Sequence, residues 1–130
     1  MSDVTTHHIR VGATAYYLPD ESNPQADEYF FGYRIVIHNT GPTTVQLLTR
    51  HWNIIDGQGH HHIVDGPGVV GEQPILKPDQ AFKYTSFTRL ETSWGTMEGH
   101  YEIRDDQGTL FQIPIERFYL TREMHEEPTD

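Results

Sequence analysis

Apolar and polar residues alternate with a period of two along most of this chain. Successive side chains of a β-strand point to opposite faces, so this pattern predicts strands with one buried and one solvated face. Four segments alternate most clearly, at 9–17, 29–37, 82–90 and 97–103. Their apolar sets are Ile9, Val11, Ala13, Ala15 and Tyr17; Tyr29, Phe31, Tyr33, Ile35 and Ile37; Phe82, Tyr84 and Leu90; and Met97, Gly99, Tyr101 and Ile103.

Two further segments predict strands of a different kind. Residues 45–56 are apolar on both faces, which indicates a central strand or a strand with a bulge. Residues 110–120 alternate around Pro114, and we expect an edge or a bulge there because proline cannot donate to a ladder. Segments rich in Gly, Pro, Asn and Asp separate the strands. Short strands joined by such turns predict an all-β antiparallel sandwich.

The length of 130 residues suits one domain, and neither an internal repeat nor a linker divides the chain. We therefore predict a single sandwich domain over residues 1–120, within which residues 1–6 are loose. The polar and acidic residues 121–130 are predicted to form a flexible tail.

The net charge of the chain argues against some classes of binding partner. Nine basic and nineteen acidic residues give a net charge of −10, which opposes binding to nucleic acid and to anionic membranes. The sequence has no cysteine, so disulfides and thiolate ligands are excluded. No apolar run approaches the roughly 20 residues that span a bilayer, and no signal-peptide core precedes the first strand. These observations predict a cytoplasmic protein.

The segment from Gly66 to Gly71 spells G-x-G-x-x-G, a pattern found in nucleotide-binding loops. That fingerprint requires a helix at its last glycine, and Pro74 and Pro78 follow here instead. Two interpretations stay open. The amides around Gly66, Gly68 and Gly71 hold a small anion such as pyrophosphate, with Arg50 and Lys77 as local positive charges. Alternatively, the glycines allow positive φ in a loop that crosses between sheets, which is the interpretation we favour.

Arg50, His51 and Trp52 lie within one predicted strand. Alternation places Arg50 and Trp52 on one face and His51 on the other, so the three cannot line one pocket without a bulge. Trp52 is predicted to be the core aromatic residue of the sandwich. Arg50 is assigned equally to partner binding and to a structural pairing, for example with Glu72.

The run His60-His61-His62 follows a turn at Asp56–Gly59. In an extended strand, His60 and His62 share a face and form a weak site for a divalent metal. A solvated loop is the favoured interpretation, because no second ligand cluster completes a closed site. No cofactor is predicted. Nucleophile elbows, H-E-x-x-H and P-loop motifs are all missing, which predicts that the protein is not an enzyme.

Five segments stand out in their order and spacing: Phe31-Gly32-Tyr33, Gln46 to Trp52, Gly66 to Pro74, Phe82 to Ser86 and Gly95 to Tyr101. In these segments the chain resembles the ApaG family. The resemblance implies an immunoglobulin-like or fibronectin-III-like sandwich and a family without a settled biochemical activity. It also implies an association with cobalt tolerance and magnesium efflux in bacteria, and with protein interaction in related eukaryotic domains.

The combined evidence favours a non-enzymatic binding module for a protein partner. Alternation places Tyr16, Phe30 and Phe87 opposite the core sets, where aromatic side chains are candidates for binding hot spots. An exposed edge strand would also permit a homodimer by extension of a sheet. Binding of a small anion by the glycine loop and weak binding of a divalent metal are the alternatives.

Overall fold

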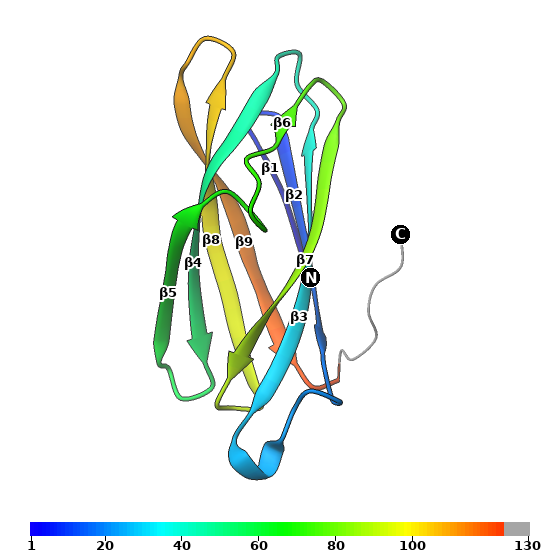
Figure 1. Cartoon of the computed structure of the whole chain (residues 1–130), viewed down its shortest axis with the longest axis vertical. Helices are drawn as coiled ribbons and strands as arrows, with labels where there is room; N and C mark the ends of the chain where they lie inside the picture. Colours follow the sequence, from blue (N-terminus) through cyan, green and yellow to red (C-terminus); the bar gives the residue numbers. More distant parts are fainter. Residues whose placement is uncertain (124–130) are drawn as a thin grey trace.

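The structure is a computed structural model, and it describes residues 1–123 as two antiparallel β-sheets packed face to face (Figure 1). The predicted all-β sandwich is therefore confirmed. The first sheet has the strand order β1-β2-β3-β7, and the second has the order β5-β4-β8-β9 with β6 also paired to β4. The strands are β1 (Ser2–Thr6), β2 (Ile9–Tyr17), β3 (Tyr29–Asn39), β4 (Val45–Asp56), β5 (His61–Pro67), β6 (Ile75–Leu76), β7 (Ala81–Leu90), β8 (Trp94–Asp105) and β9 (Leu110–Thr121).

The only helical element among the described residues is a short 3₁₀ turn, Pro24–Ala26, between β2 and β3. No helix in residues 1–123 has the length and apolar character needed to cross a membrane. The predicted tail at 121–130 begins inside β9, which ends at Thr121, and its residues 124–130 lie outside the described part.

Trp52 lies at the centre of the core, as predicted, with an exposed fraction of 2%. Its indole meets Tyr33 of the opposite sheet and Phe118 of β9 edge to face, at ring-centroid distances of 5.5 and 5.9 Å. Such pairs add to the stabilisation that burial of the rings provides. The inner faces of both sheets consist of the alternating apolar residues, so the period-two pattern sets the interior of the sandwich.

β4 is both a central strand and a bulged one, which explains its apolar character on both faces. It pairs with β8 on one side and with β5 and β6 on the other. Its register against β8 shifts between Leu47 and Thr49, so Leu48 is an extra residue. Buried side chains therefore fall at Val45 and Leu47 before the bulge, and at Trp52 and Ile54 after it. β9, which contains Pro114, lies at the end of its sheet as expected.

Three strands were not predicted. The expectation that residues 1–6 are loose is wrong, because β1 pairs with β2 along its whole length. The solvated-loop interpretation is wrong for His61 and His62, which begin β5. β5 has almost no buried residue and β6 has two residues in all, so neither produces the burial pattern on which a sequence prediction depends.

The turn between β4 and β5 is organised by the buried carboxylate of Asp56. Its Oδ1 accepts hydrogen bonds from the backbone N–H groups of Gln58 and His60, at 2.9 and 3.0 Å. Burial alone would raise the pKa of this carboxyl, but these hydrogen bonds outweigh burial and the pKa is lowered. Asp105 makes the same pair of bonds in the turn between β8 and β9, so one turn design is used twice.

We expect Asp56→Ala to lower the free energy of unfolding at pH 7 by about 1–3 kcal/mol, because two backbone donors lose their acceptor. A lowered folded-state pKa means that the carboxylate stabilises the fold above its unfolded pKa of about 3.9. This contribution is lost as the pH falls through the folded pKa, so the variant and the native chain converge in acid. Urea unfolding at several pH values measures the difference, with the exposed Asp106→Ala as control. Equal losses in the two variants would contradict the assignment.

Candidate binding face on the four-stranded sheet

The glycine segment directs most of its backbone groups into the protein. Gly66 lies one residue before the end of the ladder between β4 and β5, where it pairs with Arg50. The N–H of Gly68 donates to the carbonyl of Leu48 at 2.7 Å. Val69 and Glu72 exchange both backbone hydrogen bonds, at 2.8 and 2.9 Å, and Val69 is fully buried. The N–H groups of Gly68, Val69 and Glu72 are therefore occupied within the fold, and an anion nest there would have to form without them.

The tip of the loop is a two-residue turn and not the start of a helix. Val70 and Gly71 both have positive φ, of 43° and 82°, as a turn of type I′ requires. Glycine reaches this region freely, whereas a β-branched residue such as Val70 is strained in it. The structure thus confirms that no helix follows the G-x-G-x-x-G pattern.

Arg50 holds this loop against β4. Its side chain lies over Gly66, where any added Cβ would meet the guanidinium at about 3 Å. The Nη1 atom donates to the carbonyl oxygens of Pro67 and Gly68, at 3.0 and 3.1 Å. This pairing is structural. The acceptors are backbone carbonyls of the loop, and not the carboxylate of Glu72 that the sequence suggested.

The guanidinium of Arg50 also lies close enough to three core tyrosines to influence the pKa of their hydroxyls. The hydroxyls of Tyr84 and Tyr101 hydrogen-bond to each other at 2.5 Å within the core. Burial raises the pKa of both phenols, and that of Tyr33, while the charge of Arg50 opposes the rise. All three are therefore neutral at pH 7, and they serve as packed, hydrogen-bonded residues.

The other predicted site residues are dispersed. Lys77 lies in the turn after β6, where its backbone bonds with Gln80. His60 precedes β5 and contacts the carboxylate of Asp56 at 3.4 Å, while His62 lies within β5. Among the described residues, no group of three or more His, Asp or Glu side chains could hold a metal ion. The anion site and the metal site remain predictions.

His51 faces the outside of the five-stranded sheet, opposite to Arg50 and Trp52 as alternation predicts. Its Nδ1 atom bonds the carboxylate of Asp65 at 2.5 Å, and its ring stacks on His100 at 4.8 Å. Burial and the neighbouring imidazole together lower the pKa of His100. Asp65, His51 and His100 thus form a row on the solvent-exposed outer face of the sheet, separate from the glycine loop.

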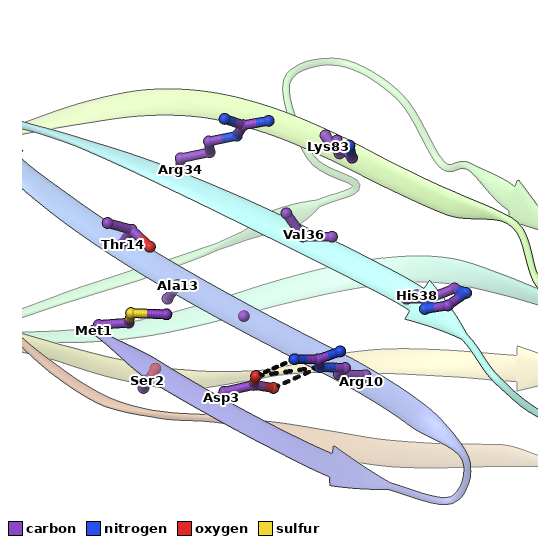
Figure 2. Close-up of a pocket in the computed structure, with 11 residues that line it drawn as sticks. Met1, Ser2, Asp3, Arg10, Ala13, Thr14, Arg34, Val36, His38 and Lys83 are labelled. Carbon is purple, nitrogen blue, oxygen red and sulfur yellow. Dashed lines mark hydrogen bonds and ion pairs between the residues drawn. The ribbon is translucent and has the colours of Figure 1, made fainter. Parts of the chain in front are cut away.

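The outer face of the four-stranded sheet carries a cluster of basic side chains that was not predicted from the sequence. Arg10 of β2, Arg34 and His38 of β3, and Lys83 of β7 border a hollow of about 350 Å³ (Figure 2). Gly12, Ala13, Thr14 and Val36 form its floor, and Met1 and Asp3 of the N-terminal segment close one side. We call Arg10, Arg34, His38 and Lys83 the basic face.

Arg10 and His38 of the basic face contact nearby carboxylates. The Nε atom of Arg10 donates to Asp3 Oδ1 at 2.9 Å, which lowers the pKa of that carboxyl. His38 Nε2 lies 3.0 Å from the carboxylate of Asp79. Within a protein of net charge −10, the basic face is nevertheless a local concentration of positive charge.

An aromatic group adjoins the basic face on the same surface. Phe87 of β7 has an exposed fraction of 65%, and its ring lies 6.3 Å from that of Phe30 on β3. Tyr16, by contrast, is buried, because its ring lies across Gly32 where any side chain would collide with it. Of the three aromatic residues expected outside the core, Phe87 and Phe30 thus form an accessible pair.

Alternation could have found the basic face. In β2 and β3, the positions between buried residues are Arg10, Gly12 and Thr14, and Arg34, Val36 and His38. Lys83 has the same phase in β7, and the register places it beside Val36. The missing information was the strand order, because only the pairing of β2, β3 and β7 brings these residues together.

Comparison with known proteins identifies the family. The model of the ApaG domain matches residues 19–105, which is more than half of the chain. The chain belongs to the ApaG family. It is 48% identical over 120 residues to Protein ApaG of Azoarcus sp. (strain BH72), covering 92% of this chain and 94% of that protein. Protein ApaG of Paramagnetospirillum magneticum (strain ATCC 700264 / AMB-1) is 47% identical over 128 residues and 98% of each chain.

A solved structure of a similar protein has the same fold. The crystal structure of an ApaA protein from Bordetella pertussis superimposes with a TM-score of 0.87 at 40% identity, covering 92% of this chain and 97% of that one. The resemblance seen in the sequence is therefore confirmed, and the ApaG sandwich is the frame that carries both the loop held by Arg50 and the basic face.

We expect Arg50→Met to lower the free energy of unfolding by about 1–3 kcal/mol, because the carbonyls of Pro67 and Gly68 lose a charged donor. Arg104→Met is the matched control, since the hydrogen bond from Arg104 to Gln46 lies exposed on the outer face of the same sheet. Amide hydrogen exchange should show loss of protection at Gly68 and Val69 in the Arg50 variant alone. Unchanged protection there would contradict the role of Arg50.

We expect Val70→Asn to raise the free energy of unfolding by about 0.5–1 kcal/mol, because asparagine tolerates the positive φ that strains valine. Gly71→Val should have the opposite effect, since it puts a β-branched residue at a φ of 82°. Thermal unfolding of the two variants measures both signs. A less stable Val70→Asn protein would mean that contacts of the valine side chain outweigh its backbone strain.

Proposed function

We propose that this ApaG protein is a non-enzymatic binding module that docks a protein partner on the outer face of its four-stranded sheet. The observation that carries the proposal is the coincidence of an aromatic pair, exposed Phe87 and half-buried Phe30, with the basic face on one surface. Aromatic and arginine side chains are the residue types that dominate binding energy at protein interfaces.

Electrostatics indicates the character of the partner. A chain with a net charge of −10 repels acidic molecules at long range, but the basic face attracts a carboxylate within a Debye length of about 8 Å. Arg34 and Lys83 come from neighbouring strands, so carboxylates spaced along one segment can reach both. An acidic segment with an aromatic or aliphatic anchor beside Phe87 therefore fits this surface best.

The perturbed groups of the described chain support binding over catalysis. The tyrosines with raised pKa lie within the core, and Asp56 with its lowered pKa organises a turn. Neither group lines the hollow beside the basic face. The perturbed groups that do line it, Asp3 and Arg10, are paired with each other, which lowers the pKa of the carboxyl and makes them an ion pair in place of a poised acid and base. The association of the family with cobalt tolerance and magnesium efflux would then act through the bound protein, without a metal held by His60 and His62.

Binding of pyrophosphate or another small anion by the glycine loop is the less supported alternative. The loop commits three amides and the guanidinium of Arg50 to its own fold. An anion would have to use the tip at Val70 and Gly71, where the turn offers little positive charge. Protein binding at the basic face requires no rearrangement of the loop.

The test is site-specific photo-crosslinking in cells, followed by affinity measurement with the partner that it identifies. Phe87→benzoylphenylalanine should give a discrete crosslinked protein. Tyr119→benzoylphenylalanine, on the opposite sheet and exposed to 56%, is the control and should not. Lys83→Glu should weaken binding of the purified partner about tenfold, because it reverses a charge in the contact.

Lys77→Glu makes the same charge change at an exposed lysine outside the basic face, and its affinity should stay near that of the native chain. Equal crosslinking from both positions, or equal loss of affinity in the two lysine variants, would reject the proposed surface.

A further inference from the structure

β5 lies at the end of the five-stranded sheet, with β4 on one side and its other edge facing outward (Figure 1). Two hydrogen bonds set the phase of its backbone. Asp56 N–H donates to the carbonyl of His60, and Gly68 N–H donates to that of Leu48. In an antiparallel ladder, residues that bond the neighbour alternate with residues that point away from it. The even-numbered residues of β5 therefore bond β4, and His61, Ile63 and Asp65 direct their N–H and C=O groups outward.

Pro67 ends this outward row. It is the next odd-numbered position, and proline has no N–H to offer. Its carbonyl already accepts the hydrogen bond from Arg50. The available edge is therefore limited to the segment His61–Asp65, which is a short strand with an apolar residue at its middle.

The side chains of this segment are self-complementary. Ile63, with an exposed fraction of 54%, has His61 two residues before it and Asp65 two residues after it, all on the outer face. His61 is held there by a 3.1 Å contact with Asn53, and Asp65 by its bond to His51. A strand that meets its own copy in antiparallel orientation about Ile63 places each His61 opposite an Asp65.

We propose that a second copy of this chain pairs with the first through β5, in an antiparallel arrangement whose twofold axis passes beside Ile63. Ile63 exchanges both backbone hydrogen bonds with its symmetry mate, and His61 does so with Asp65 of the second copy. The pairing joins the two five-stranded sheets into one continuous sheet. The imidazole and the carboxylate form a favourable cross-strand pair on each side of an isoleucine pair.

A second copy fits this edge better than an unrelated strand. When two identical copies pair in antiparallel orientation, each imidazole lies opposite a carboxylate and each isoleucine lies opposite an isoleucine. The contact is short, and each copy carries a net charge of −10, so the dimer is weak and requires salt to screen the repulsion. The basic face lies on the other sheet and stays accessible in this dimer. The inference is therefore independent of the proposed protein partner.

Sedimentation velocity at physiological salt, over concentrations up to the millimolar range, tests the proposal. The native chain should sediment as a reversible monomer–dimer mixture. Ile63→Lys and Ile63→Glu should each weaken self-association by about tenfold or more, because they place like charges opposite each other at the axis. An equimolar mixture of the two variants should recover association, because opposite charges then face each other.

Ile75→Lys is the matched control. It introduces the same charge at an isoleucine of β6 that is exposed to 60%, outside the proposed contact, and should dimerise as the native chain does. Circular dichroism confirms that each variant is folded. A native chain that stays monomeric throughout, an Ile63→Lys protein that associates normally, or a mixture without recovery would each overturn the proposal.

Discussion

Each strand of this sandwich can give only one side of its residues to the core, and this constraint organises the whole molecule. The inner faces are occupied by aromatic and aliphatic side chains packed around Trp52. Polar chemistry is therefore confined to the outer faces, the edges and the loops. The basic face lies on the outside of one sheet, and the row of Asp65, His51 and His100 lies on the outside of the other.

Arg50 is the exception to this division, and its position explains why glycines occur in the loop. It shares the inward phase of Trp52, yet its guanidinium reaches the carbonyls of Pro67 and Gly68. The loop in turn delivers Val69 into the core and leads the chain from β5 to β6. Gly66 is small enough to let the arginine lie over the strand. The conspicuous glycines of the sequence thus accommodate one arginine, at Gly66, and two backbone positions of positive φ, at Gly68 and Gly71.

The fold could be predicted from the sequence where burial imposes a period. Six strands, the central position of β4 and the core role of Trp52 followed from alternation, and the family followed from its motifs. β5 could not be found in this way, because both of its faces are largely exposed and leave no apolar period. Tyr16 is buried because its ring lies across Gly32 of the neighbouring strand. Arg34 and Lys83 come together because β3 pairs with β7. Both features depend on which strands are neighbours. The local order of residues does not determine which distant strands pair.

The extra residue at Leu48 gives β4 a change of phase partway along its length. Odd-numbered residues face the interior before it, and even-numbered residues face the interior from Arg50 onward. Lineages of this protein should therefore accept many replacements of Leu48, and even its loss, because Thr49 would then follow Leu47 in regular alternation and Trp52 would stay in the core. A residue added between Arg50 and His51, with the bulge kept, would instead turn Trp52 toward the solvent and His51 toward the core, and so invert the second half of the strand.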